Sequence, residues 1–321
     1  MKAIRVASHG GAEVLRLEEV AAPEPRPGEV LIRVDAAGVN FVEIYQRTGL
    51  YPLQLPYTPG GEAGGEVVAV GSGVTSLRLG DRVASVAVQG SYAELALLAE
   101  ERAVMLPEAI SVEQAAASML QGMTAHYLAF TTFPLKPGDS CVVHAAAGGV
   151  GLLLVQIAKR CGARVFATVS TEEKGQLARE AGADVVIRYL QEDFAAVVQE
   201  ATGGKGVNVV YDSVGQTTFE KSLGCLAPLG MLVLFGQSSG PVPPMSPRAF
   251  AAGSLFFTRP SLYHYVADRA SLERRAGDVL RWVADGSLKL RIERRYPLAE
   301  APAAQRALEG RQTTGKVLLV P

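Results

Sequence analysis

Cysteine and histidine are scarce in this chain of 321 residues, which contains three of the first and four of the second. Cys141, Cys161 and Cys225 form no C-x-x-C pair, so a zinc ribbon is excluded and a disulfide framework is not expected. No two histidines have the spacing of metal ligands, and His126 and His144 are expected to be core or strand residues. The sequence therefore predicts no metal site, and it predicts that Cys141 and Cys225, which lie in apolar surroundings, are buried and inert.

An excess of charge of one sign is also missing, since 31 basic and 32 acidic side chains give a net charge of −1. Proteins that bind nucleic acids or membrane surfaces normally need a basic face, so both classes are disfavoured. No apolar run approaches the ~20 residues that a membrane span requires, and the start of the chain lacks the pattern of a signal peptide. We expect a cytoplasmic protein that, given its length, has two domains.

Two different repeating patterns divide the chain. Up to residue 120, short valine-rich runs alternate with glycine and proline, as in a β-barrel or sandwich, and a helix is predicted to start after Asn40 and to end at Gly49. Residues 121–260 alternate strand, turn and helix, which predicts parallel strands joined by right-handed helical crossovers. Residues 261–321 return to strand, helix and strand. The prediction is a mixed α/β protein in which a doubly wound parallel-sheet domain, 121–260, is inserted into a mainly β domain formed by 1–120 and 261–321.

Two glycine clusters are candidates for a phosphate-binding loop. "SCVVHAAAGGVGLLLVQIAKR" (140–160) has an apolar strand before the glycines and a run of helical length after them, as a dinucleotide fingerprint requires. There Gly148 allows close approach of the backbone, Gly151 allows the helix to pack on the strand, and Ala146 replaces the first glycine. A plain tight turn is the alternative. "TPGGEAGGEV" (58–67) leads into a strand with no helix, so its glycines are expected at a crowded corner of the barrel.

The residues after the second strand of the inserted domain bear on the choice between NAD and NADP. An acidic residue about 20 positions after the glycines normally binds the ribose 2′-hydroxyl of NAD. Here the strand ends at Ser170, with Thr171 beside it and Lys174 one helical turn later. Hydroxyls and a cation suit the 2′-phosphate of NADPH, which a carboxylate would repel. The alternative, kept open by Glu172 and Glu173, is that the two hydroxyls only cap the helix and Lys174 is solvated.

Seven segments carry a resemblance to a known family: "GVNFVEIYQRTGLYP" (38–52), "GDRV" (80–83), "AAASMLQGMTAHYL" (115–128), "HAAAGGVGL" (144–152), "VYDSVG" (210–215), "LFGQSSGPV" (234–242) and "FFTRPSL" (256–262). Together they resemble the zeta-crystallin-like quinone oxidoreductases of the medium-chain dehydrogenase/reductase superfamily. The resemblance covers essentially the whole chain. It implies a GroES-like β-barrel-type catalytic domain built from both termini, an inserted Rossmann domain and a homodimer.

The resemblance also implies chemistry without a metal. The related alcohol dehydrogenases bind catalytic zinc through a cysteine and a histidine, and Asn40 and Gly61 stand at those places here. Without zinc to polarise a carbonyl, the cofactor has to reduce an acceptor that is already electron-poor. The implied function is zinc- and flavin-independent reduction of quinones by NADPH, and no side chain is required as a general acid. The alternatives are a reductase of α,β-unsaturated aldehydes or ketones, a nucleotide-binding protein that binds RNA, and a zinc alcohol dehydrogenase.

Roles for individual residues follow from the matching segments. Asn40 resembles the family's asparagine near the nicotinamide and also suits the cap of its helix. Tyr45 and Tyr51 lie on the segment that lines the family's substrate cleft, or are packing residues. The positions that resemble cofactor contacts are Thr124, Tyr127, Gly149, Val150, Ser170, Lys174, Tyr189, Gly236, Gln237, Ser238, Ser239, Thr258 and Arg259. Arg311 and Lys316 either add positive charge toward the phosphates or lie on solvated surface.

Overall fold

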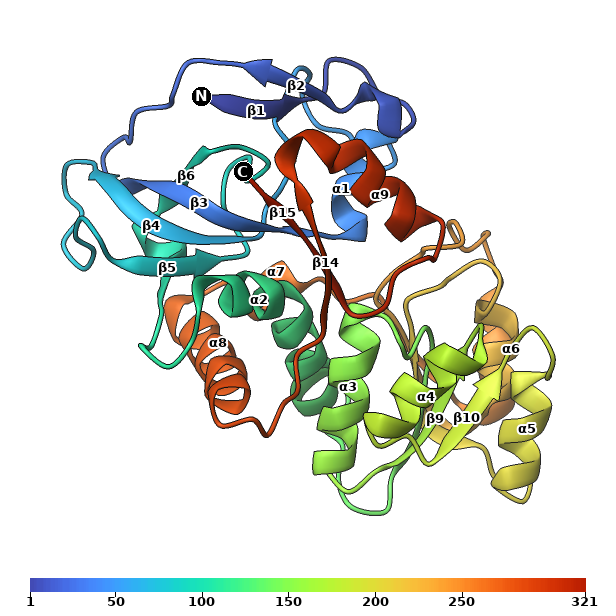
Figure 1. The fold of residues 1–321 in the computed structure, drawn as a ribbon. Coiled ribbons are helices and arrows are strands. Elements are labelled where there is room, and N and C mark those ends of the chain that lie inside the picture. Colours follow the sequence, from blue (N-terminus) through green and yellow to red (C-terminus); the bar gives the residue numbers. More distant parts are fainter. The chain divides into compact units, whose positions relative to one another are not determined.

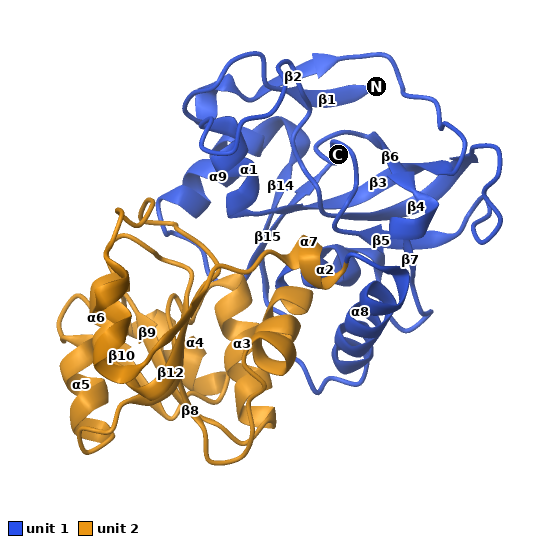
Figure 2. Cartoon of the chain, turned by 180° about the vertical axis from the view of Figure 1, so that it is seen from behind, with its two compact units in different colours: residues 1–121, 267–321 blue, residues 122–266 orange.

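The computed structural model describes all 321 residues and divides into two compact units (Figure 2). Unit 1 contains Met1–Gln121 and Ala267–Pro321, and unit 2 contains Gly122–Val266. Both ends of the chain thus belong to one unit and the middle of the chain to the other, as the sequence predicts. The domain limits after residues 120 and 260 stay a prediction.

Unit 1 is built on a seven-stranded, mainly antiparallel sheet (Figure 1). In spatial order its strands are β14 (Ile292–Pro297), β15 (Lys316–Val320), β3 (Glu29–Val39), β4 (Ala63–Val70), β5 (Arg82–Ser85) and β7 (Val104–Met105), with β6 (Leu95–Ala99) paired to β3. A separate antiparallel pair is formed by β1 (Lys2–Arg5) and β2 (Arg16–Glu19). Because β3 pairs directly with β15, the first and last parts of the chain meet in the centre of one sheet.

The helix predicted after Asn40 is present in unit 1. The helices of this unit are α1 (Phe41–Arg47), α2 (Val112–Tyr127), which continues into unit 2, α8 (Arg269–Ala284) and α9 (Ala301–Glu309). Of these, α2 was not predicted from the sequence. A capping box of Asn40 and Glu43 starts α1, because the two side chains satisfy N–H groups that the first turn leaves without partners. Gly49, with a left-handed φ of 82°, follows its last turn.

Unit 2 is a doubly wound domain with a six-stranded, fully parallel sheet. Its strands, in spatial order, are β10 (Val185–Arg188), β9 (Arg164–Val169), β8 (Ser140–Val143), β11 (Val207–Asp212), β12 (Leu226–Leu234) and β13 (Phe256–Thr258). Its helices are α3 (Gly149–Arg160), α4 (Glu172–Glu180), α5 (Phe194–Ala201), α6 (Phe219–Gly224) and α7 (Leu262–Tyr265). Counted along the chain, the strand order is 3-2-1-4-5-6, which is that of dinucleotide-binding domains. The predicted α/β fold is confirmed.

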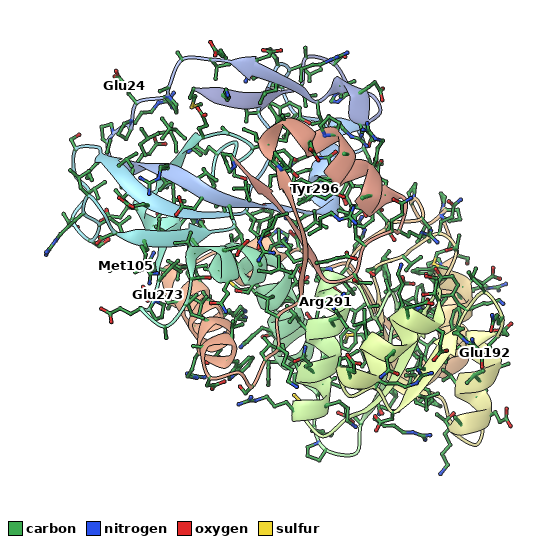
Figure 3. The ribbon with its side chains drawn as sticks, in the orientation of Figure 1. Glu24, Met105, Glu192, Glu273, Arg291 and Tyr296 are labelled. Carbon is green, nitrogen blue, oxygen red and sulfur yellow. The ribbon has the colours of Figure 1, made fainter.

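Each unit has its own hydrophobic core. Ile32, Val34 and Tyr296 belong to the core of unit 1, whereas Met105 of β7 and Glu273 of α8 are exposed on its surface (Figure 3). The core of unit 2 is formed by residues such as Val142, Phe166 and Leu232. None of the helices has the length and apolar character needed to cross a bilayer.

Two of the three thiols, all of which belong to unit 2, are buried in its interior, as predicted. Cys141 and Cys225 are buried, and no cysteine is in a disulfide. Burial raises the pKa of Cys225 to about 12, and it raises the pKa of Cys141 further. Because the thiolate is the reactive form, both groups are chemically inert at neutral pH.

Candidate functional site

The turn between β8 and α3 has the geometry of a phosphate-binding loop. Gly148 is the N-cap of α3 with an extended backbone, and no side chain caps this end of the helix. The first N–H groups of a helix that follows a parallel strand attract anions when nothing else pairs them. A Cβ on Gly151 would lie 2.4 Å from the carbonyl oxygen of Ala145 and 2.7 Å from the Cα of Ala146. Glycine is therefore needed at position 151 for α3 to pack against the turn.

The left-handed residue of this turn is an alanine. Ala145 has a φ of 50°, and its carbonyl oxygen accepts the N–H of Gly148 at 2.8 Å. Ala146, which replaces the first glycine of the fingerprint, does not have a positive φ. The methyl group at position 146 is tolerated for this reason, and the unusual backbone conformation lies one residue earlier than the fingerprint suggests.

Ser170 and Lys174 lie at the carboxyl end of β9, where the 2′-phosphate is predicted. Both are half-buried. Thr171 caps α4, because its hydroxyl accepts the backbone N–H of Lys174 at 3.3 Å. The capping role that the sequence left open is thus confirmed for Thr171, and contact of Ser170 and Lys174 with a cofactor stays a prediction.

The negative charge of Glu172, which lies next to the predicted 2′-phosphate site, is partly neutralised. Glu172 pairs with Arg179 at 2.6 Å and with Arg188 at 3.5 Å, and the hydrogen bond from Arg179 lowers the pKa of its carboxyl. Arg188, at the end of β10, precedes the half-buried Tyr189. Sequence reasoning did not single out Arg188, because its position beside the end of β9 depends on the pairing of two strands.

The loop 236–239 after β12 is tied to its neighbours in unit 2. The side-chain oxygen of Gln237 accepts a hydrogen bond from Nη2 of Arg259 at 2.8 Å, so two predicted cofactor contacts meet directly. The hydroxyl of Ser239 donates to the carbonyl oxygen of Val214 at 2.7 Å. The loop lies at the carboxyl end of the parallel sheet, where open α/β sheets bind ligands.

Three of the predicted cofactor contacts in unit 2, Thr124, Tyr127 and Thr258, are positioned by packing. Tyr127 is almost fully buried, and its ring stacks on that of Tyr265 with centroids 4.1 Å apart. Thr124 is buried on the same helix, and Thr258 is half-buried at the end of β13. Burial raises the pKa of the Tyr127 hydroxyl. The stacked ring of Tyr265 gives Tyr127 a packing role in addition to the predicted cofactor contact.

A buried polar network lies at the carboxyl ends of β8, β9 and β11. His144 is 1% exposed, with Nδ1 2.9 Å from the hydroxyl of Thr168 and Nε2 3.0 Å from the hydroxyl of Ser222. Asp212, also buried, accepts from Thr218 at 2.7 Å. Burial lowers the pKa of His144, and the negative charge of Asp212 opposes this shift only in part. The histidine is a neutral core residue, as predicted.

This lowered pKa predicts a loss of stability in acid. Unfolded His144 binds a proton near pH 6.5 whereas folded His144 binds one only at lower pH, so its contribution is present above pH 6.5 and is lost as pH falls below it. Between pH 6.5 and roughly 5.5 the wild type should lose up to about 1 kcal/mol more than the His144→Gln variant. The measurement is urea unfolding followed by circular dichroism. Equal pH slopes in the two proteins would show that His144 is not the group that titrates. Glu43, whose pKa is raised to about 7, contributes with opposite sign but cancels in the comparison.

In unit 1, three buried polar side chains meet where β3, β4 and β15 come together. Nζ of Lys316 lies 2.5 Å from Oε2 of Glu62 and 2.7 Å from Oδ1 of Asn40. Nδ2 of Asn40 donates to the same Glu62 oxygen at 3.0 Å, and Oε1 of Glu62 accepts the N–H of Leu120 at 2.6 Å. Lys316 and Glu62 are both 0% exposed. Each end of the Asn40 amide is therefore bound within the protein, and its orientation is fixed.

Strand register brings these three residues together. β3 pairs with β4 on one side and with β15 on the other. Asn40 directly follows β3, Glu62 directly precedes β4 and Lys316 is the first residue of β15, so the pairing of the strands places the three side chains together. A Cβ on Gly38 would lie 2.0 Å from Oε2 of Glu62, so the glycine leaves room for the carboxylate. The alternative of a solvated Lys316 is wrong. Its ammonium group is enclosed by Glu62 and Asn40, and this arrangement does not favour direct contact with phosphates.

The donor set at this place does not fit a catalytic zinc ion. At the two positions that the family resemblance relates to the zinc ligands of alcohol dehydrogenases, this chain has an amide, Asn40, and a glycine, Gly61. Glu62 beside them is already paired with Lys316. Zinc sites use thiolate, imidazole and carboxylate ligands, and no group of three or more such side chains occurs anywhere in the chain. No chemical step is assigned to a metal.

Tyr45 and Tyr51 pack against each other. Their ring centroids are 5.2 Å apart in an edge-to-face arrangement, and both side chains are half-buried. The packing role that the sequence left open is therefore present. Contact with an acceptor stays a prediction, as does a role for Arg311, which is exposed and has a φ of 56°.

The chain matches known protein families in segments that belong to both units. Residues 26–131 match the alcohol dehydrogenase GroES-like domain, and residues 149–284 match the family described as zinc-binding dehydrogenase. A quinone oxidoreductase of Pseudomonas aeruginosa is 46% identical over 323 residues, which cover 100% of this chain and 99% of that protein. A 2-haloacrylate reductase of Burkholderia sp is 42% identical, with 97% and 96% of the two chains covered. The crystal structure of Escherichia coli quinone oxidoreductase complexed with NADPH matches with a TM-score of 0.98 at 43% identity, over 100% of both chains.

Proposed function

The chain belongs to the quinone oxidoreductases of the medium-chain dehydrogenase/reductase superfamily, and from this we propose that it reduces quinones with NADPH, without zinc or flavin. The observation that carries the proposal is the uncapped glycine turn of unit 2, which is suited to pyrophosphate. Unit 1, taken by itself, has the buried Glu62–Lys316 ion pair and no group of side chains that could hold zinc. Full-length similarity to named quinone oxidoreductases supports the same activity.

The protein's own contribution is binding and orientation. The N–H groups of Gly149 and Val150 would hold the pyrophosphate, and Ser170 and Lys174 would hold the 2′-phosphate. Asn40 would contact the nicotinamide, and its bonds to Glu62 and Lys316 keep its amide in one orientation. When bound, NADPH supplies a hydride, and a quinone that takes this hydride and one proton from solvent becomes a hydroquinone. An acceptor that is already electron-poor needs placement and exclusion of water rather than an acidic side chain.

Steady-state oxidation of NADPH tests the proposal. With 1,4-benzoquinone or 1,2-naphthoquinone as acceptor, we expect turnover with the purified protein, no loss of rate after treatment with a zinc chelator, and a kcat/KM for NADH at least about tenfold lower than for NADPH. The Lys174→Gln variant tests the predicted contact with the 2′-phosphate. It should lose the preference for NADPH and keep its rate with NADH, which serves as the internal control. Absence of turnover with every quinone would contradict the proposal.

Reduction of an activated alkene is the second candidate, because a 2-haloacrylate reductase is similar over nearly the whole chain. Such an acceptor also carries an electron-poor carbon that takes a hydride. The same assay with 2-alkenals and 2-haloacrylate separates the two. Activity on these compounds alone would replace quinone reduction as the function.

We further propose that the protein acts as a cytoplasmic homodimer on a small-molecule acceptor. The strand at the edge of the unit 2 sheet, β13, carries two exposed phenylalanines, Phe256 and Phe257, at 54% and 44% exposure. An apolar edge strand of this kind favours pairing with a second copy. The net charge of −1 does not favour a nucleic-acid partner.

A further inference from the structure

A group of buried polar side chains in unit 1 contains more hydrogen-bonding atoms than partners. Glu43 and Arg47 lie one turn apart on α1, and Gln305 lies on α9, which packs against α1 (Figure 1). Tyr57 and Tyr92 come from two loops of the same unit. The buried atoms without a hydrogen-bond partner are Oε1 of Glu43, Nε and Nη1 of Arg47 and the hydroxyl of Tyr57, while the Tyr92 hydroxyl and the Gln305 amide have no partner other than each other. Buried polar atoms normally pair with protein or with ordered water, so this concentration needs an explanation.

These side chains are close enough to act on one another. Burial raises the pKa of Tyr57 to about 12, an effect that Arg47 opposes and Glu43 reinforces. Burial also raises the pKa of Tyr92; the negative charge of Glu43 adds to the shift, and a hydrogen bond with Gln305 and the positive charge of Arg47 oppose it. Each tyrosine therefore experiences the charges of both α1 residues. The unpaired atoms belong to one cluster.

The cluster has too few acceptors. Oε2 of Glu43 accepts the N–H of Asn40 at 2.8 Å, and Nη2 of Arg47 donates to Glu309 at 2.6 Å. The pKa of Glu43 is raised to about 7, chiefly by burial, so its carboxyl is protonated in a large share of molecules at neutral pH. Because Oε2 accepts, that proton belongs on Oε1, which then needs an acceptor. The remaining nitrogens of Arg47 can only donate.

The charges decide what supplies these acceptors. Arg47 is neutralised by Glu309, and Glu62 nearby is neutralised by Lys316. With Glu43 protonated, the cluster has no net charge. An anion would bring an unpaired charge into a buried region, which is costly. A water molecule brings no charge and can accept two hydrogen bonds and donate two, which suits sites with two to four polar partners.

We propose that Glu43, Arg47, Tyr57, Tyr92 and Gln305 enclose an internal hydration site that holds a small cluster of ordered water molecules. This site goes beyond the proposed function and does not depend on it. Glu43 also accepts the N–H of Asn40 at the start of α1, so the water cluster supports the helix that carries the predicted nicotinamide-side asparagine.

High-resolution crystal structures of the full chain test the proposal. We expect ordered water within hydrogen-bonding distance of Oε1 of Glu43 and of Nε or Nη1 of Arg47 in the wild type. The Gln305→Met variant, which is similar in size but has no amide, should lose or displace at least one of these waters. A Gln312→Met variant, changed at an exposed residue after α9, should keep them all. Direct pairing of the protein atoms with no water between them would overturn the proposal.

Measurements in solution give a second readout, and its wild-type part does not depend on any variant folding. Oxygen-17 relaxation dispersion of the wild type should show water molecules that exchange slowly with solvent, and fewer of them in Gln305→Met than in Gln312→Met. Crystals soaked in bromide test the alternative occupant. Bromide bound to Arg47 in place of water would overturn the assignment, and a site that keeps its water would support it.

Discussion

Replacing Lys316 with methionine should destabilise unit 1 by about 3–5 kcal/mol, the cost of removing one partner from a buried ion pair. Methionine fills most of the volume of the lysine side chain but leaves the carboxylate of Glu62 buried with no cation. Urea unfolding followed by the fluorescence of Trp282, the only tryptophan, reports on unit 1 directly.

Two further variants separate the ion pair from the loss of a side chain. The double variant Glu62→Gln, Lys316→Met removes both charges and should recover part of the lost stability, since an amide still accepts the N–H of Leu120. Lys289→Met, at an exposed lysine, should change stability by less than about 0.5 kcal/mol. A loss for Lys316→Met no larger than that of an exposed pair, about 1 kcal/mol, would contradict the buried-pair account.

Replacing Gly151 with alanine should destabilise unit 2 by about 1–3 kcal/mol, the usual cost of forcing an extra methyl group into a packed region. The new Cβ would lie 2.4 Å from the carbonyl oxygen of Ala145, which is backbone and cannot rotate away. The N-terminus of α3 has to shift, so NADPH should bind at least about tenfold more weakly, a loss of about 1.4 kcal/mol. Thermal unfolding by circular dichroism and a fluorescence titration with NADPH measure the two effects.

Gly277 offers a matched control for this substitution. It lies in the middle of α8, and a Cβ there would have no atom within 4 Å. Gly277→Ala should therefore stabilise the protein by up to about 1 kcal/mol, the difference in helix propensity, and leave NADPH binding unchanged. Gly151→Ala that is as stable as the wild type would refute the close-packing role of Gly151. Weaker stability with unchanged NADPH affinity would keep the packing role and refute the link between this packing and cofactor binding.

The sequence alone was sufficient for features that depend on local pattern. The alternation of strand, turn and helix predicted the parallel sheet of unit 2, because each element carries its own periodicity. The return to a strand pattern near the C-terminus predicted that both ends share one unit. Asn40 and Thr171 were recognisable as helix caps, since a cap and its N3 partner are only three residues apart.

Pairings between distant residues were decided only by the tertiary structure. Lys316 and Glu62 are 254 positions apart, and nothing local shows that β3 lies between their strands. For the same reason, the sequence did not indicate that Arg188 lies beside Glu172, or that unpaired polar atoms gather near α1 and α9. Lys316 stands at the start of the apolar run "KVLLV", and this position was the one indication in the sequence that its charge could be buried. The run does not indicate which residue pairs with it. Periodicity encodes which face of a strand is buried, whereas register between strands decides which buried charges meet.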